Sequence, residues 1–259
     1  IIARKGKSRL WLVAHMDTVP LWIDPEIRNG KIFGRGAVDN KSNIATAITV
    51  CNELTNINIC FTIGEEKDMV GAKKASTIIG DDIAIVMEPT NGEIYSSQRG
   101  AISFIVKTVG KQGHSAYIRQ GDSAISKLVQ TLAELEKNNW TAFNIGHISG
   151  GIATNVIANE AEAHISVRPK TTEEHKNILN SIKKFKILTN IPPRKSNIIK
   201  GKSKKTFTEM AFFKNAFIWG IGDMRFAHTA REQITIKELE NGPEKLKKLL
   251  AIIIQKTKR

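Results

Sequence analysis

The chain has 259 residues, 41% of them hydrophobic, and its 39 Lys and Arg against 25 Asp and Glu leave a formal net charge of +14. This composition predicts a globular protein, and no apolar stretch approaches the ~20 residues that cross a bilayer. The N-terminal IIARKGKSRL lacks the apolar core of a signal peptide, so a cytoplasmic location is predicted. The basic residues are dispersed and match no nucleic-acid-binding motif, so we predict neither nucleic-acid nor membrane binding.

The first ninety residues alternate apolar strands with helical segments. In chain order, the patterns predict a strand at 10–14, a helix at 43–54, a strand at 59–63, a helix at 69–79 and a strand at 83–87. The helical stripe of the first helix consists of Ile44, Ala47, Ile48, Cys51 and Leu54. This order is typical of a mostly parallel sheet covered by helices. Cys51 and Cys60 lack CxxC spacing and are predicted to be reduced, buried thiols.

After residue 92 the predicted strands become neighbours in the sequence. The expected elements are strands at 93–98 and 101–109, a helix at 122–137, strands at 143–149 and 155–169, and a helix at 171–185. This order predicts a separate α+β domain inserted into the first. The basic segment NIPPRKSNIIKGKSKK then leads back to a strand at 217–222 and a helix at 243–256. The predicted domains are 1–91, 92–188 as the insertion, and 189–259.

Metal-capable side chains follow each of the three early strands. In chain order they are His15, Asp17, Glu65, Glu66 and Glu88. In an open parallel α/β sheet, ligands bind outside the carboxyl ends of the strands, where these residues would meet. The sequence therefore predicts a single site there.

Two further residues extend this predicted site. Asp39 lies in the glycine-rich segment GRGAVDNKSN, where the backbone can approach a ligand closely, and His228 follows the strand at 217–222. The glycine spacing fits neither GxGxxG nor a P-loop, which argues against a phosphate loop. Imidazole combined with shared carboxylates suits Zn²⁺, and a bridging carboxylate suits a pair of ions.

Six motifs in this order resemble a known family. They are HMDTVP, GRGAVDNK, GEE, MEPTNG, KQGHSA and AHTARE. Together they resemble the zinc-dependent aminoacylase/desuccinylase/glutamate carboxypeptidase family of co-catalytic metallopeptidases, over residues 10–239. The resemblance implies an α/β fold, with a mostly parallel-sheet dinuclear-zinc catalytic domain and an inserted α+β, ferredoxin-like lid and dimerisation domain.

The resemblance also implies roles for the residues of the first domain. One zinc would be held by His15, Asp39 and Glu88, with Asp39 bridging to a second zinc that Glu66 and His228 hold; Co²⁺ could substitute. Asp17 resembles the aspartate that hydrogen-bonds the ligand histidine and fixes its ring. Glu65 matches the general base that takes a proton from the attacking water.

In the inserted domain, the resemblance implies that His114 stabilises the oxyanion across a dimer interface, and hence that the protein is a homodimer. Asn155 and Arg168 resemble the residues that contact the carbonyl and the carboxylate of the substrate. Arg suits a carboxylate because its planar fork can bind both oxygens.

Within the family, VMEPTNG and the QRGAISF strand look most like the archaeal and thermophile hydrolases of lysine and arginine biosynthesis. Those enzymes release lysine or ornithine from a small acidic amino-group carrier protein, and a +14 chain would suit an acidic partner. An N-acyl derivative could replace the carrier protein as the substrate. The alternative functions within the family are those of a succinyl-diaminopimelate desuccinylase, an acetylornithine deacetylase or a dipeptidase. The segment KKTFTEM, residues 204–210, departs from the family pattern, and a catalytically weak binding protein that keeps the fold is a further alternative.

Overall fold

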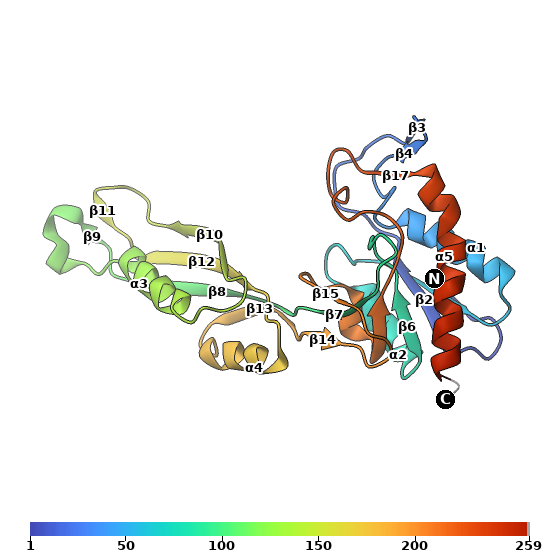
Figure 1. Ribbon diagram of the computed structural model, residues 1–259. Helices are drawn as coiled ribbons and strands as arrows, with labels where there is room; N and C mark the ends of the chain where they lie inside the picture. The colour runs from blue at the N-terminus through green and yellow to red at the C-terminus, as the bar shows by residue number, and fades with distance from the viewer. Residues whose placement is uncertain (258–259) are drawn as a thin grey trace. The chain divides into compact units, whose positions relative to one another are not determined.

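The structure is a computed structural model, and it describes residues 1–257, with the side chain of residue 257 left out. The chain divides into two compact units (Figure 1). Ile1–Gln98, Lys195–Lys204 and Thr208–Arg259 form the first unit, while Arg99–Arg194 and Lys205–Phe207 form the second. The sequence boundaries at 92 and 188 differ from this division because the strand before residue 99 joins the first unit's sheet and the chain after 188 completes a strand of the second.

The main sheet of the first unit has the strand order β1-β5-β2-β6-β16-β7-β14, and β15 pairs with β7. These strands are β1 (Ile2–Ala3), β2 (Leu10–His15), β5 (Asn58–Thr62), β6 (Ile83–Val86), β7 (Tyr95–Gln98), β14 (Arg194–Lys195), β15 (Lys202–Lys204) and β16 (Asn215–Ile218). The four central strands β5, β2, β6 and β16 are parallel, whereas β1 pairs with β5 and β7 pairs with β16 in antiparallel fashion. The predicted mostly parallel sheet is therefore confirmed.

Helices cover both faces of this sheet, which explains why β2 is apolar at successive positions (Figure 1). Leu10, Leu12 and Ala14 pack in one cluster with α1 (Lys41–Glu53) and α5 (Ile236–Thr257). Trp11 and Val13 point to the opposite face and pack in a second cluster with α2 (Val70–Ile79). The continuous burial of β2 leaves His15, its last residue, at the carboxyl end of a strand covered on both sides.

The buried face of helix α1 includes Ala47 and Cys51 of the predicted apolar stripe, but it also includes polar residues and leaves out Ile48. Ile48 is 43% exposed, whereas the polar residues Asn43 and Thr46 are fully buried. Asn43 donates to the side chain of Asn40 and accepts a hydrogen bond from the backbone N–H of Ile221. The buried face of α1 is thus partly a hydrogen-bonding surface, and a hydrophobic pattern alone does not detect such a surface.

The C-terminal helix α5 begins at Ile236, seven residues before the predicted start at Pro243, which lies inside the helix. A Cβ at Gly242 would lie 2.7 Å from the hydroxyl of Thr46 in α1, so glycine permits close packing of the two helices. The short strands β3 (Glu26–Arg28), β4 (Lys31–Phe33) and β17 (Gln233–Thr235) form a small separate sheet. The sequence prediction missed these strands because three-residue polar segments carry no clear alternation.

The second unit has a four-stranded antiparallel sheet with the order β10-β12-β8-β13. Its elements are β8 (Ala101–Val109), α3 (Ala124–Glu136), β10 (Asn144–Gly150), β12 (Glu160–Val167), α4 (Thr172–Ser181) and β13 (Lys186–Ile191). The βαββαβ order with this strand arrangement is ferredoxin-like, as predicted. A two-stranded sheet of β9 (Gly113–His114) and β11 (Val156–Ile157), with the 3-10 turn η1 (Ser115–Gln120), completes the unit.

The core of the second unit lies between its sheet and its helices. Ile102, Phe104 and Val106 of β8 are buried in one cluster with Leu128 and Leu132 of α3. Across the described residues, no helix is long and apolar enough to cross a membrane. Cys51 and Cys60 are free and buried, as predicted.

Candidate active site

His15 stands at the centre of the site, at the carboxyl end of β2. Its side chain is 1% exposed. Its Nδ1 lies 3.0 Å from the backbone carbonyl of Asp17, while its Nε2 lies 3.0 Å from Oδ1 of Asp39. A proton on Nδ1, donated to the carbonyl oxygen, leaves Nε2 as the nitrogen that can bind a metal.

Asp39 lies between two histidines from distant parts of the chain. Its Oδ1 contacts Nε2 of His15 at 3.0 Å, and its Oδ2 lies 3.3 Å from Nε2 of His228. Each carboxylate oxygen therefore faces one imidazole, which is the arrangement expected of a carboxylate that bridges two ions. The loop that carries Asp39 connects to α1, and Asn40 fixes it by donating to the carbonyl of Met87 at the end of β6.

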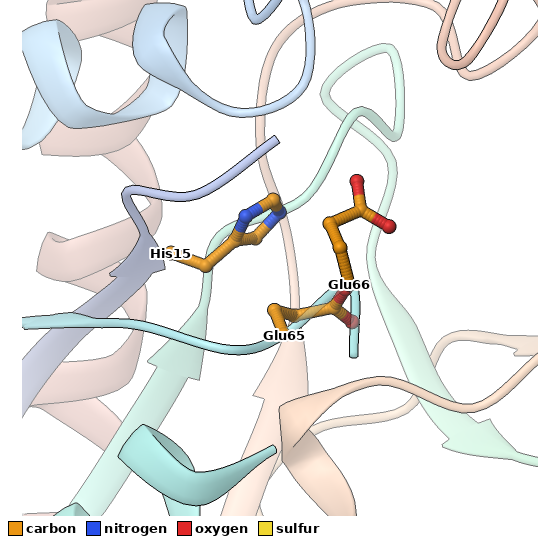
Figure 2. Close-up of side chains that lie close together, drawn as sticks. All are labelled: His15, Glu65 and Glu66. Atoms are coloured by element: carbon orange, nitrogen blue, oxygen red, sulfur yellow. The ribbon is translucent and has the colours of Figure 1, made fainter. Parts of the chain in front are cut away.

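Glu65 and Glu66 follow β5, and Figure 2 shows their side chains beside the imidazole of His15. Potential ligand atoms of His15, Glu65 and Glu66 lie within 4.8 Å of one another. The backbone N–H groups of both glutamates donate to the carboxylate of Asp17, at 3.3 and 3.1 Å. Asp17 therefore orients the two glutamates, and its carboxylate lies 3.8 Å from Nδ1 of His15, too far for the hydrogen bond that the resemblance implies.

His228 follows β16 and lies in the left-handed region at φ +62°, which is uncommon for a residue with a side chain. Its Nε2 contacts Oε1 of Glu66 at 2.8 Å. Potential ligand atoms of Asp39, Glu66 and His228 form a second group within 4.8 Å, so Glu66 belongs to both groups. The backbone strain is consistent with a functional role, since such conformations cluster at active sites.

Glu88, two residues beyond the end of β6, is 4% exposed and is not a member of either group. Its Oε2 lies 3.2 Å from Nζ of Lys204, and its buried Oε1 has no hydrogen-bond partner among the described residues. The backbone of Glu88 packs closely against Gly220, where a Cβ would lie only 2.4 Å from the backbone oxygen of Glu88. Sequence analysis did not anticipate the ion pair with Lys204.

The charges at the site shift the protonation of its residues strongly. Burial alone would lower the pKa of His15, but Asp39 and Glu88 outweigh it and raise that pKa to about 11. The hydrogen bond to Asp39 raises the pKa of His228 to about 9. Burial and the charge of Glu88 raise the pKa of Glu65 to about 9. At Asp39 burial also acts to raise the pKa, but His15 and His228 outweigh it and hold that pKa below its ordinary value. Without a bound cation, the two histidines thus favour their protonated forms, and Glu65 favours its neutral form.

This donor set fits a pair of divalent cations. Two imidazole nitrogens and several carboxylate oxygens suit Zn²⁺ and its first-row neighbours, and Oε1 of Glu88 is a buried oxygen still lacking a partner among the described residues. Metal binding would replace the protons on His15 and His228, because a histidine must be neutral to bind a metal.

A buried ion pair that sequence analysis did not assign holds two of these loops together. Glu232 is 1% exposed, and its Oε2 contacts a guanidinium nitrogen of Arg35 at 2.5 Å. Its Oε1 accepts hydrogen bonds from the backbone N–H groups of Val38, at 3.2 Å, and Asp39, at 3.0 Å. Because Glu232 lies four residues after His228, it ties the loop of one histidine to the loop of Asp39. Both residues of the ion pair lie within predicted motifs, Arg35 in GRGAVDNK and Glu232 at the end of AHTARE.

A second unassigned acid, Glu209, lies in the 3-10 turn η2 (Glu209–Phe212) and is fully buried. Neither of its carboxylate oxygens has a hydrogen-bond partner among the described residues. Burial, together with the nearby charges of Glu88 and Asp17, raises the pKa of Glu209 to about 7, although the neighbouring Thr62 and His15 oppose this rise. Gln98 holds the turn in place through hydrogen bonds with the side chain and backbone of Thr208.

In the second unit, the structure brings His114 and Asn155 together although 41 residues separate them in the sequence. Strands β9 and β11 pair there, and the N–H of Ser115 donates to the carbonyl of Asn155 at 3.0 Å. Both side chains belong to exposed residues. Nδ1 of His114 accepts a hydrogen bond from the N–H of Ala116, so the proton of the neutral ring is on Nε2, which can donate to an oxyanion.

Arg168 lies at the opposite end of β12 from this pair. Asn155 precedes the strand and Arg168 follows it, so its eight residues separate the two by roughly 25 Å. The guanidinium of Arg168 lies over the ring of Phe207, 5.2 Å from its centre, and burial lowers its pKa. Within the second unit, the predicted oxyanion residue His114 thus lies with one predicted substrate-binding residue, Asn155, and apart from the other, Arg168.

Comparisons with known proteins agree with this fold. Residues 96–186 match the M20 family model described as the peptidase dimerisation domain. The chain is 28% identical to a peptidase M20 domain-containing protein of Schizosaccharomyces pombe, over 96% of this chain and 70% of that protein. It is 26% identical to a probable carboxypeptidase of Arthroderma otae, over 95% of this chain and 70% of that protein. Residues 96–186 are therefore similar to the peptidase dimerisation domain, and nearly the whole chain is similar to proteins named as M20 peptidases or carboxypeptidases.

Solved structures share the fold at low sequence identity. A tripeptidase from Staphylococcus aureus superposes with a TM-score of 0.83 at 19% identity, covering 98% of this chain and 83% of that one. A Bacillus subtilis protein, described as a dinuclear metal binding peptidase from the M20 family, gives a TM-score of 0.72 at 15% identity, covering 98% and 85%. The α/β fold with its inserted domain is that of the M20 peptidases.

Proposed function

We propose that this protein is a metallohydrolase that uses two divalent cations to cleave a peptide or peptide-like amide bond. The observation that carries this proposal is the position of Asp39, whose two carboxylate oxygens each face a different histidine, at 3.0 and 3.3 Å. Glu66 adds a carboxylate to the group around His228. Names of relatives such as peptidase and carboxypeptidase support the same reaction class.

When bound, the two ions would polarise the scissile carbonyl and acidify the attacking water. We assign His15, Asp39 and Glu88 to one ion, and Asp39, Glu66 and His228 to the other. Glu65 takes the proton of the attacking water and delivers it to the departing amine. Asp17 positions Glu65 by accepting its backbone N–H.

The substitution Glu65→Gln tests this assignment. It keeps the size of the side chain and the backbone hydrogen bond to Asp17 but removes the proton acceptor. Metal content measured by mass spectrometry should stay near that of the wild type, while hydrolysis falls by at least about a hundredfold. Glu53→Gln, at an exposed residue paired with Lys247, is the matched control and should leave both unchanged. A Glu65→Gln protein with nearly full activity would contradict the role of Glu65.

Zinc is the metal that we propose, with cobalt as a substitute, because the donors are imidazole nitrogens and carboxylate oxygens. The measurement is the metal content of the protein purified without added metal, followed by reactivation of the chelator-treated protein with zinc, cobalt, manganese or magnesium. Reactivation by magnesium alone would contradict a zinc enzyme, since magnesium prefers an all-oxygen set of ligands.

For the substrate, we propose a peptide or an N-acyl amino acid with a free carboxylate, which the guanidinium of Arg168 would bind. The probable carboxypeptidases among the relatives support a peptide. More specifically, we propose that the protein releases lysine or ornithine from an acidic carrier protein in lysine or arginine biosynthesis. The formal charge of +14 supports this proposal, because a basic surface suits an acidic partner. The predicted cytoplasmic location is consistent with it.

A hydrolysis screen separates these substrates. It compares di- and tripeptides with N-acetyl, N-succinyl and γ-glutamyl derivatives of lysine, ornithine and diaminopimelate, in the presence of zinc or cobalt. Turnover of only the unmodified peptides would exclude the biosynthetic proposal and keep the peptidase. Turnover of a γ-glutamyl derivative in preference to the peptides would support the carrier protein.

We also propose a homodimer formed through the second unit. Because roughly 25 Å separates the His114 and Asn155 pair from Arg168, one copy of this unit cannot place both groups on a small substrate, whereas two copies can. Edge strand β10 and helix α3 offer a contact surface, where Val129 is 60% and Ile148 is 57% exposed. The buried residues of α3 are instead Ala124, Leu128, Leu132 and Leu135.

A catalytically weak binding protein is the second candidate function, and the ion pair between Glu88 and Lys204 favours it, since an ammonium already contacts a proposed metal ligand. Titration calorimetry with zinc discriminates between the two. A purified protein that binds no zinc, and that stays inactive after zinc or cobalt is added, would support the binding protein and exclude the metallohydrolase.

A further inference from the structure

We propose that Lys204 weakens metal binding at Glu88, so that the two metal sites have unequal affinities and the site containing Glu88 is the weaker one. This inference rests on the proposed function. It concerns a residue of KKTFTEM, the segment that departs from the family pattern.

The contact itself is well defined. Nζ of Lys204 lies 3.2 Å from Oε2 of Glu88, and the side chains are only 11% and 5% exposed. Because little water reaches this pair, solvent screens it less than it screens surface ion pairs. Glu88 also retains a buried Oε1 with no hydrogen-bond partner among the described residues. A metal ion can therefore bind one oxygen of Glu88 while Lys204 contacts the other.

The backbone holds Lys204 in place next to Glu88. Lys204 is the last residue of β15, where it pairs with Gln98 of β7. Gln98 in turn accepts hydrogen bonds from the backbone and the hydroxyl of Thr208, at 3.0 and 2.8 Å. These bonds fix both ends of the segment between Lys204 and Thr208, so the lysine stem starts from a fixed point beside the site.

Charge decides the direction of the effect. The other proposed carboxylate ligands, Asp39 and Glu66, contact histidines, which become neutral when they bind a metal. The ammonium of Lys204 contacts Glu88 and opposes a dication that shares the same carboxylate. Lys204 would also orient Glu88, which favours binding, but repulsion between a unit charge and a dication at this range outweighs the gain from orientation.

The test is titration calorimetry of chelator-treated protein with Zn²⁺. Wild-type protein should bind two ions with distinct affinities. Lys204→Met keeps the length of the stem without the charge, so the weaker site should tighten by at least about tenfold while the tighter site changes little. Lys204→Arg keeps a cation and should resemble the wild type. Lys205→Met removes the same charge from the adjacent, exposed lysine and is the matched control.

Thermal unfolding gives a second readout that does not depend on calorimetry. Without metal, Lys204→Met leaves Glu88 buried and unpaired, so the Tm should fall below that of the wild type. With saturating Zn²⁺, the rise in Tm should be larger for Lys204→Met than for the wild type. If the methionine variant does not fold, Lys204→Gln replaces it in both measurements, because glutamine can still donate to Glu88 without a charge.

The outcomes separate this inference from the proposed function. Unchanged or weaker Zn²⁺ binding by Lys204→Met, with two ions still bound by the wild type, overturns the role of Lys204 and leaves the two-metal site intact. A wild-type protein that binds no Zn²⁺ overturns the proposed function itself. Equal tightening in Lys205→Met would show a general effect of net charge and would also overturn the role of Lys204.

Discussion

The two units hold their predicted functional residues in opposite ways. In the first, His15, Asp39 and Glu88 are each at most 5% exposed, and each contacts another charged or polar group of the same unit. In the second, His114 and Asn155 belong to exposed residues on a small two-stranded sheet. A buried charge needs an ion-pair or hydrogen-bond partner within the folded unit, because burial without one is costly. An exposed group is solvated by water and can still bind a substrate or a second protein surface. We therefore expect the proposed metal chemistry in the first unit, and we expect the predicted residues of the second unit to act only against a partner surface.

The largest effect should come from Asp39→Asn, which sharpens the description of the first unit. Asparagine keeps the shape but loses the charge shared by two histidines, so we expect fewer than two bound metal ions per chain. Activity should fall by about a thousandfold or more, since the ions contribute several kcal/mol to the transition state. Asp24→Asn, at an exposed loop residue, is the control. Two tightly bound ions in Asp39→Asn would show that Asp39 does not bridge them.

The next effect belongs to the second unit. His114→Ala should lower kcat by about a hundred- to a thousandfold, as for the loss of one oxyanion donor, with the metal content unchanged. Mixing this variant with Glu65→Gln should restore partial activity, because one of the two sites in a mixed dimer would then combine an intact Glu65 with an intact His114. Subunit exchange without recovered activity, or a fully active monomer by light scattering, would contradict a role of His114 across the dimer interface.

A smaller effect is expected where the first unit positions its ligands. Glu232→Gln puts an amide against Arg35 and weakens the acceptor for the N–H of Asp39. Zinc affinity should fall by about ten- to a hundredfold, in the range seen when the outer partners of metal ligands are changed. The measurement is zinc competition with a coloured chelator. Unchanged zinc affinity combined with a lower Tm would mean that Glu232 only stabilises the fold.

The sequence predicted the fold and the strand-end site because both follow from regular patterns. Residues at the ends of parallel strands must meet at one edge of the sheet, so His15 and Glu66 could be placed together without knowledge of the loops. The prediction failed where polar groups are buried. On α1, Asn43 is buried and Ile48 is exposed, because hydrogen bonds to loops decide which face turns inward.

The roles that depend on exact geometry could not be read from the sequence. A motif indicates that Asp17 lies near His15, but only coordinates show that its carboxylate accepts the N–H groups of Glu65 and Glu66. Likewise, an ion pair such as Glu88 with Lys204 joins residues that are 116 positions apart and follows from no local pattern.

The last prediction, with the smallest effect, concerns Glu209. Unlike the other buried acids of the first unit discussed above, Glu209 has no ion-pair or hydrogen-bond partner among the described residues. The pKa of Glu209 is about 7 in the folded chain, compared with an ordinary value of 4.5, which we take for the unfolded chain. Between these values the folded state binds more protons than the unfolded state, so the free energy of unfolding decreases as pH rises from 4.5 to 7. Above pH 7, the charged Glu209 should cost up to about 3 kcal/mol, from the size of the shift.

Glu209→Gln removes this titration and should therefore stabilise the metal-free protein at pH 8 by more than at pH 5. Urea unfolding at both pH values measures the difference, and Glu53→Gln, at an exposed site, should show no such dependence on pH. An equal change at pH 5 and pH 8 would mean that Glu209 does not titrate in this window. If the glutamine variant is less stable than the wild type at pH 8, the charge of Glu209 is stabilised by a neighbouring group.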